Sequence, residues 1–253
     1  MILLKERYKP LIDFFVLHQT IYLTYLNLHY TYFLILAASL AGPLLLSFDK
    51  KVAFYKNWKY LFPAILLPAS LYIVWDFYFT GKGVWHFNEN YITGIKIYNL
   101  PVEEVLFFFI VPYCCVFIYE CIKVYFPKIK DKVTADIILM LLALILWVTG
   151  IICYQKYYTS WTFIFNAIFI AIIYTFRKHF KTFDATSFLV AYCIMLIPFL
   201  IINGFLTAIP VVLYNDAENL GLRIYTIPFE DTFYGMLLIL MTIVIYENLK
   251  SKD

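Results

Sequence analysis

The stretch Leu100-Pro101-Val102-Glu103-Glu104 places two acidic residues at the start of a strongly apolar segment. The pattern returns as Ile227-Pro228-Phe229-Glu230-Asp231, again at the start of an apolar segment. The two prolines are 228 − 101 = 127 positions apart. At this fixed offset, residues 76–123 align with residues 203–250 without a gap, and 12 of the 48 positions are identical. Self-similarity at one constant spacing predicts an internal duplication.

The composition is that of a membrane protein. The chain is 63% hydrophobic and 15% charged, against roughly 45–50% and 25% in soluble domains. Its long apolar segments predict transmembrane helices rather than the short alternating strands of a barrel. A net charge of +3 is too small to indicate a nucleic-acid partner. The cysteines lie in apolar segments without metal-ligand spacing, which predicts free thiols and no metal site.

We predict an all-α polytopic membrane protein with about seven transmembrane helices. The expected spans are residues 30–48, 60–79, 101–124, 134–154, 160–176, 187–207 and 228–248. The last three repeat the first three, and the fourth has no counterpart. A single extra crossing restores the orientation of the second copy, so this 3+1+3 order predicts two parallel internal repeats.

Basic residues indicate the orientation of the chain. Twelve lie on one side of the predicted spans: Lys50, Lys51, Lys56, Lys59, Lys128, Lys130, Lys132, Arg177, Lys178, Lys181, Lys250 and Lys252. Four lie on the other side: Lys82, Lys96, Lys156 and Arg223. Cytoplasmic loops are rich in Lys and Arg. We therefore expect loops 80–100 and 208–227, with both acid pairs, to face away from the cytoplasm.

The duplication divides the chain into four parts. Residues 30–126 form the first repeat, 127–156 a linker with its own transmembrane helix, and 157–253 the second repeat. Residues 1–29 are an N-terminal extension. An interfacial amphipathic helix is favoured there over an extra span or an extension from an upstream start.

The acid pairs have a structural and a functional interpretation. Proline followed by Glu is an ordinary helix start, with Asn99 and Thr226 as candidate caps. Ionisable groups at membrane depth are costly, however, and most of them are functional. Burial and a neighbouring carboxylate both favour a protonated acid, which can deliver a proton near neutral pH.

Within each pair, Glu103 and Glu230 are favoured as the working acids because they are identical. Neighbouring helical residues point about 100° apart, so Glu104 and Asp231 are expected to hydrogen-bond, to tune the acids or to take a proton back. Asp76 ends the second span on the same side and joins the cluster. Its counterpart is Asn203, so the two halves differ chemically.

Glu120 and Glu247 are a second conspicuous acid pair. Lys123 and Lys250 follow three positions later, so an ion pair within each helix end explains them. We expect a structural role there.

Aromatic residues make up 21% of the chain, and many of them suit membrane interfaces. They also crowd around the acids, as Trp75, Phe77, Tyr78, Trp85, Phe87, Phe107, Phe108, Phe109, Phe233 and Tyr234. Aromatic faces stabilise cations without acting as bases. An apolar aromatic cavity with a neutral acid at one end suits the protonation of an alkene, because the carbocation is kept from water.

Several segments together resemble the lycopene cyclase domain, the small membrane type of bacteria, archaea and fungi. They are Leu45-Leu46-Ser47-Phe48-Asp49-Lys50-Lys51, Trp75-Asp76-Phe77, Gly83-Val84-Trp85-His86-Phe87-Asn88, Pro101-Val102-Glu103-Glu104 and Ile118-Tyr119-Glu120. The resemblance covers residues 29–250. It is looser in the second repeat, where Val212 stands at the position of Trp85.

The resemblance implies an isomerase, an intramolecular lyase that converts lycopene to β-carotene through γ-carotene without redox change or cofactor. It assigns the acid role to Glu103, Glu104, Glu230 and Asp231, and also to Asp76. It implies lycopene and membrane lipid as partners and a multi-pass location in a cell membrane, a bacterial inner membrane. It leaves open a homo-oligomer or an association with other carotenoid enzymes.

Three other functions suit parts of this pattern. A retinal protein needs a lysine in the last span for the Schiff base, and none stands between Phe229 and Asn248. A proton-coupled transporter also suits intramembrane acids in duplicated halves. A non-catalytic subunit of a carotenoid complex is compatible with Asn203 opposite Asp76.

Overall fold

The computed structural model describes residues 28–127, 129 and 133–252. The predicted extension lies almost entirely outside the described residues, as do Lys128, Lys130 and Lys132 of the charge count. The helices are α2 (Thr31–Leu46), α3 (Trp58–Lys82), α4 (Val102–Tyr125), α5 (Val133–Ile152), α6 (Tyr157–Thr175), α7 (Ala185–Ala208) and α8 (Glu230–Lys250). Short 3-10 turns lie at Phe54–Asn57 and Glu89–Tyr91.

Six of the described helices are long and apolar enough to cross a membrane. The exception is α2, whose 16 residues span about 24 Å at 1.5 Å per residue, less than the ~30 Å of a hydrocarbon core. The chain is therefore a helical membrane protein, as predicted, but its first span is shorter than the sequence pattern indicated.

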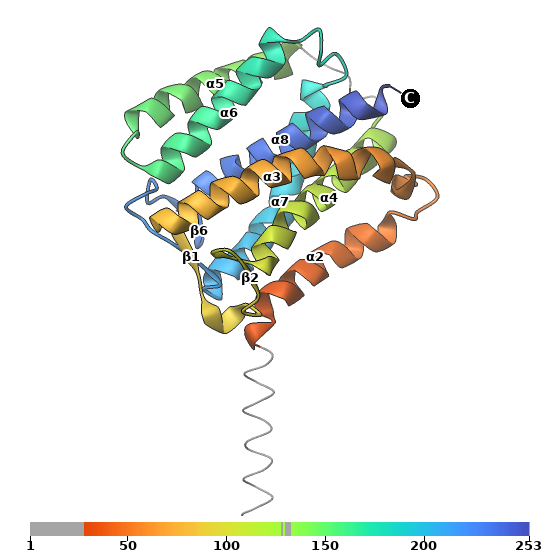
Figure 1. Cartoon of the computed structure of the whole chain (residues 1–253). Helices are drawn as coiled ribbons and strands as arrows, with labels where there is room; N and C mark the ends of the chain where they lie inside the picture. Colours follow the sequence, from red (N-terminus) through yellow and green to blue (C-terminus); the bar gives the residue numbers. More distant parts are fainter. Residues whose placement is uncertain (1–27, 128, 130–132, 253) are drawn as a thin grey trace, which may run out of the picture.

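The helices form two parallel repeats around a shared core, which confirms the 3+1+3 prediction. Helices α3 and α7 begin at equivalent positions, since 185 − 58 = 127. Central helix α4 packs against α2 and α3 of its own repeat and α7 of the other, while α8 packs against α6 and α3. The repeats therefore interlock rather than stand side by side. The unmatched α5 lies against α6 at the edge of the bundle (Figure 1).

A two-stranded sheet marks the pseudo-two-fold axis between the repeats. Strand β1 (Trp85–Phe87) pairs antiparallel with β4 (Val212–Tyr214). At its centre His86 faces Leu213, which is its own repeat equivalent because 213 − 86 = 127. The flanking backbone hydrogen bonds are reciprocal: Asn88 N donates to Val211 O and Asn215 N to Val84 O, both at 2.9 Å. Such a self-complementary contact is the signature of two-fold symmetry.

Each repeat also carries a small hairpin just before its central helix, which the sequence analysis did not anticipate. Strands β2 (Lys96–Ile97) and β3 (Leu100–Pro101) pair in the first repeat, and β5 (Arg223–Ile224) and β6 (Ile227–Pro228) in the second. The turns have matching backbones, with φ of 58° at Tyr98 and 60° at Tyr225. Lys96 bridges Glu89 in one loop, and Arg223 bridges Asp216 at the equivalent positions of the other.

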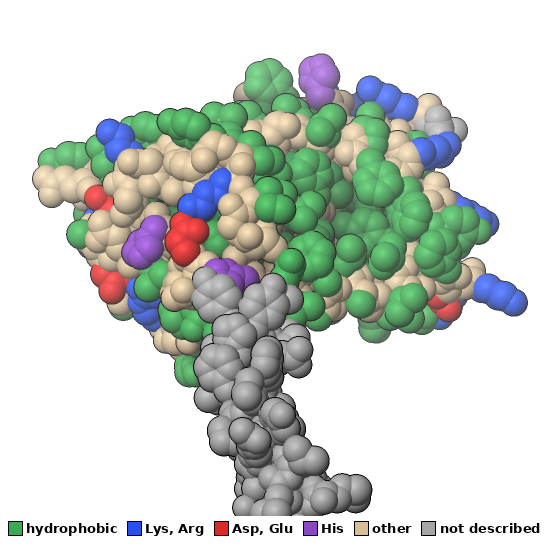
Figure 2. Space-filling model, turned by 60° about the horizontal axis from the view of Figure 1, so that its bottom comes forward, with side chains coloured by type: hydrophobic (Ala, Val, Ile, Leu, Met, Phe, Trp, Pro, Cys, Tyr) green, Lys and Arg blue, Asp and Glu red, His purple; other side chains and the backbone are tan. Residues whose placement is uncertain are grey.

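Charged side chains gather toward the two ends of the bundle, with an apolar surface between them (Figure 2). At the end opposite the hairpins, Lys123 Nζ lies 2.6 Å from Glu247 Oε1, and Lys250 Nζ lies 2.8 Å from Glu120 Oε2. The prediction of ion pairs within each helix is therefore wrong. Because α4 and α8 lie next to each other at the core, each lysine reaches the glutamate of the other repeat, and these pairs join the repeats.

Candidate active site

A small cavity lies between the repeats at the hairpin end of α4 and α8. Its volume is about 40 Å³, and both repeats line it. The acids at its wall are Glu104 of α4 and Asp231 of α8. The remaining wall is aromatic or apolar apart from Asn203, and its rings are Tyr32, Trp85, Phe87, Phe107, Tyr158, Phe199, Tyr214 and Tyr234. The site therefore combines carboxyl groups with a largely apolar aromatic chamber.

Glu104 lies in the first turn of α4, where the chain passes from the hairpin into the helix. It is 9% exposed, and the hydroxyl of Tyr32 donates to its Oε2 at 2.5 Å. The Glu104 carboxyl lies within electrostatic range of both Asp76 and Asp231. Three acids from three helices thus meet at one place.

Asp231 stands at the equivalent position of the second repeat but has different partners. The hydroxyl of Tyr158 donates to its Oδ1 at 2.5 Å, and that of Tyr214 donates to its Oδ2 at 2.9 Å. Burial, and next the charge of Asp231, raise the pKa of Tyr214 well above its ordinary value, so this loop phenol keeps its proton. Both oxygens of Asp231 accept hydrogen bonds, as suits an ionised carboxylate.

Asp76 lies near the end of α3 and is fully buried. Its Oδ1 accepts hydrogen bonds from Trp85 Nε1 at 2.5 Å and from Thr80 Oγ1 at 3.2 Å. Its Oδ2 is buried without a hydrogen-bond partner among the described residues. The counterpart Asn203 instead lines the cavity and donates its amide to Phe199 O at 2.9 Å. The acid cluster is therefore asymmetric.

The structure keeps Glu103 and Glu230 apart from the cavity wall. Both are fully buried, and Oε1 of each accepts the backbone N–H of a loop residue at 2.7 Å, Thr93 for Glu103 and Leu220 for Glu230. These donors are equivalent, since 220 − 93 = 127. Glu230 also accepts from Thr159 Oγ1 at 2.5 Å. The two identical glutamates therefore perform the same local task, which is to hold the loop before the hairpin onto the helix that follows.

The expected helix caps are also placed differently. The residues that precede α4 and α8 are Pro101 and Phe229, and neither has a side-chain cap. The Asn99 amide donates to Phe77 O, while the Thr226 and Thr207 hydroxyls bond to each other. Both side chains fasten the hairpin to the neighbouring second helix of the repeat, so their prediction as caps is wrong.

The rings around the acids pack edge to face or stack. Trp85 lies 5.1 Å from Tyr158 and 5.9 Å from Tyr234, and Tyr158 stacks on Tyr214 at 5.8 Å between centroids. No Lys or Arg is among the described residues that line the cavity. The described residues include no cluster of His, Cys, Asp or Glu that could hold a metal ion. A cation formed here would meet aromatic faces and carboxylates.

Sequence reasoning missed the tyrosines that bind the acids, namely Tyr32, Tyr158 and Tyr214. The sequence did contain a sign of the hydroxyl groups that the first helix of each repeat, α2 or α6, contributes. At the offset of 127, Tyr32 aligns with Thr159, and both donate a hydroxyl hydrogen bond to an acid of their own repeat. Extending the alignment upstream of residue 76 would have exposed this pair of hydroxyls.

Comparison with known proteins agrees with this geometry. The profile of the lycopene cyclase family matches residues 29–122 and 155–249, one segment in each repeat. No curated protein and no solved structure was found to match the chain. The two matched segments together cover most of the sequence and contain all of the acids described above. This membrane protein belongs to the lycopene cyclase family.

Proposed function

We propose that the chain is a lycopene β-cyclase, which converts lycopene to β-carotene through γ-carotene by a redox-neutral isomerisation. The observation that carries this proposal is the single cavity in which Glu104 and Asp231 meet among aromatic rings. An alkene is a weak base, so its protonation needs a neutral acid in a dry, apolar chamber. Lycopene is an apolar polyene and dissolves in the bilayer that surrounds such a chamber.

Glu104 is the proposed proton donor. It accepts one hydrogen bond, from Tyr32, and Asp76 stands nearby as a second acid. A lone neutral carboxylic acid costs far less to bury than a carboxylate. A proton on Glu104 can be shared with the neighbouring Asp76 and given to the terminal double bond of a substrate end.

The proton adds to the terminal double bond and leaves a tertiary carbocation on the adjacent carbon. The next suitably placed double bond attacks this carbon, closes a six-membered ring and moves the positive charge onto the ring. Trp85, Tyr158 and Tyr234 surround this position, and their ring faces stabilise the cation without reacting as bases. The substrate end would displace water, which would otherwise add to the cation, from the small chamber.

Asp231 is the proposed proton acceptor. Two phenol hydrogen bonds hold it as a carboxylate facing the cavity, so it can remove a ring proton and create the ring double bond. One proton enters the hydrocarbon and one leaves, so the product is an isomer. Transfer of that proton from Asp231 back to Glu104 resets the pair, since the two groups interact.

We further propose the functional division of the chain and its location. Residues 30–126 and 157–253 act as the two cyclase repeats, joined by the linker 127–156, in the cell membrane of a bacterium. The described lysines at the end opposite the hairpins favour a cytoplasmic position for that end. The cavity then lies toward the outer face of the membrane.

Expression in a lycopene-accumulating host tests the activity. The expected result is a change of pigment from red to orange-yellow, with β-carotene on chromatography and γ-carotene at early times. A host that keeps only lycopene while it contains well-folded protein would contradict the proposal. A host that makes only monocyclic product would retain the cyclase activity and correct the product.

A further inference from the structure

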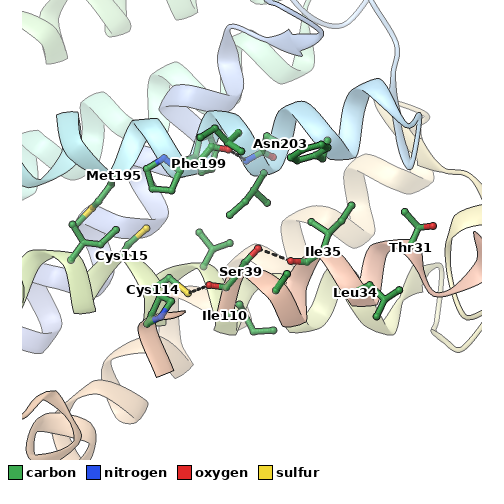
Figure 3. A pocket seen from close by; sticks show the side chains of 18 residues that line it. Thr31, Leu34, Ile35, Ser39, Ile110, Cys114, Cys115, Met195, Phe199 and Asn203 are labelled. Carbon is green, nitrogen blue, oxygen red and sulfur yellow. Dashed lines mark hydrogen bonds between the residues drawn. The ribbon is translucent and has the colours of Figure 1, made fainter. Parts of the chain in front are cut away.

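A wide apolar groove opens on the side of the bundle between α2, α4 and α7. Its volume is about 670 Å³. Side chains of α2 and α7 face each other across it, with Leu34, Ile35 and Ser39 on one side and Phe199 and Asn203 on the other (Figure 3). Leu34 and Phe205 are each 54% exposed at its rim. The groove therefore opens onto the lipid-facing surface.

The inner end of this groove meets the acid-bearing cavity. Val111, Phe199 and Asn203 line both spaces. The Phe199 side chain lies against Gly235 of α8, where an added Cβ would come within 2.9 Å of its ring. Phe199 is thus the largest of the three side chains that separate the groove from the chamber holding Glu104 and Asp231.

The two spaces differ in capacity. A cavity of roughly 150 Å³ is needed to hold a benzene molecule. The chamber, at about 40 Å³, holds no six-membered ring with its side chains as they lie. The groove, at about 670 Å³, has room for several isoprene units. A substrate end must displace a wall of the chamber, and Phe199 is the largest side chain in the wall that the chamber shares with the groove.

The equivalent position on the opposite side of the bundle, between α6 and α3, is filled by large aromatic side chains. Phe165 and Trp161 of α6 stand where α2 has Ala38 and Leu34, because 165 − 38 and 161 − 34 both equal 127. The ring of Trp75 lies 5.1 Å from that of Phe165, and Tyr78 stacks on Trp161 at 5.4 Å. Of these two equivalent sides of the bundle, the one between α2 and α7 is therefore open, and the one between α6 and α3 is filled.

We propose that the groove of α2, α4 and α7 is the entrance by which one end of a long acyclic polyene passes from the bilayer to the acids, with Phe199 as its gate. The inference rests on the proposed cyclase activity. The occupant is a long, methyl-branched apolar chain, because the groove is apolar and its inner end is continuous with the acid chamber. One entrance to one chamber means that the two ends of a substrate are cyclised separately, with release of the monocyclic product between them.

Filling the groove with the larger residues that the other repeat carries at equivalent positions tests whether the groove is the entrance. We expect Ala38→Phe, alone and with Leu34→Trp, to slow lycopene consumption in membranes by at least about tenfold, equivalent to 1.4 kcal/mol. Ala37→Phe is the matched control. Ala37 is adjacent, exposed and outside the groove lining, so its variant should keep the rate of the unmodified protein. Equal rates for Ala38→Phe and Ala37→Phe, at equal amounts of folded protein, would overturn the entrance.

A pulse–chase experiment on the unmodified protein tests the consequence without any substitution. Labelled lycopene is supplied briefly, and an excess of unlabelled lycopene follows. Release between rings predicts that labelled γ-carotene persists and little of it becomes bicyclic. Undiminished passage of label into the bicyclic product would overturn the single entrance. If the unmodified protein consumes no lycopene at all, the proposed function fails instead.

Discussion

Glu104 and Asp231 occupy equivalent positions in the two repeats, 231 − 104 = 127 residues apart, and yet they line one cavity. They also differ in their partners, since Glu104 accepts from one tyrosine and Asp231 from two. The duplication has therefore built one site from two unlike halves. An acid and a base are what a proton-initiated, proton-terminated cyclisation requires.

Replacement of Asp231 should change the identity of the product as well as the rate. In Asp231→Asn the side chain keeps its size but loses the basic oxygen that removes the ring proton. Loss of a general base costs roughly 10²–10⁴-fold in rate. We expect slow turnover, with the ring double bond appearing at other ring positions as the cation loses other protons. Chromatography with absorption spectra distinguishes these ring isomers.

Tyr214→Phe is the graded companion of that variant. It removes one of the two hydrogen bonds to Asp231 and leaves the carboxylate in place, so a rate loss of about tenfold or less is expected. Exclusive formation of β-rings at the unmodified rate by Asp231→Asn would contradict the role of Asp231.

The hydrogen bond from Trp85 Nε1 to buried Asp76 should contribute to stability. Trp85→Phe leaves Oδ1 of the carboxyl with only the longer Thr80 bond. A typical intramolecular hydrogen bond contributes about 0.5–1.5 kcal/mol. We therefore expect a lower midpoint of thermal unfolding in detergent. Trp147→Phe is the control, because Trp147 lies on α5 and is 42% exposed. Equal midpoints for the two variants would mean that the Trp85 bond adds no stability.

The fold could be predicted from the sequence because the chain contains the same pattern of residues twice. The constant offset of 127 and the odd fourth span determined the number, order and parallel direction of the repeats. Which acid of each pair lines the cavity could not be predicted from the sequence. α4 is buried on most of its surface, so the sequence shows no polar face to indicate whether Glu103 or Glu104 points at the partner repeat.

Identity between the repeats favoured Glu103 and Glu230, and the structure explains the identity in another way. Each accepts a hydrogen bond from the equivalent loop amide in its own repeat. The glutamate is therefore identical in the two repeats because the loop contact that it makes is the same in both. Glu104 and Asp231, which meet at the centre, differ between the repeats, in keeping with the different tasks that we propose for them. Identity between the repeats therefore does not by itself show which residues line the cavity that the repeats share.

The ion pairs at the end of the bundle opposite the hairpins also could not be predicted from the sequence pattern. Glu120 and Lys123 have the spacing of a local pair, and only the packing of α4 beside α8 makes Lys123 reach Glu247. No local pattern distinguishes the two arrangements.

Breaking one cross-repeat pair should destabilise the protein without removing the activity. Glu247 is 7% exposed, and removal of Lys123 leaves its charge unpaired. Lys123→Met should therefore cost about 1.5–3 kcal/mol, seen as a lower thermal midpoint, with cyclisation retained at low temperature. The double variant Lys123→Glu with Glu247→Lys should recover part of the loss.

Lys96→Met is the surface control for this comparison. Its partner Glu89 has a side chain that is 63% exposed, and exposed pairs contribute at most about 1 kcal/mol. A loss for Lys96→Met as large as that for Lys123→Met would contradict the structural role of the buried pairs.

The most direct test compares Glu104→Gln with Glu103→Gln at equal amounts of folded protein in a lycopene-accumulating host. Glutamine cannot give a proton to an alkene, so Glu104→Gln should lower the rate of cyclisation by at least about 10²-fold. Glu103→Gln keeps an oxygen that can accept the Thr93 amide and should remain largely active. An active Glu104→Gln beside a folded but inactive Glu103→Gln would contradict the account and return the proton to Glu103.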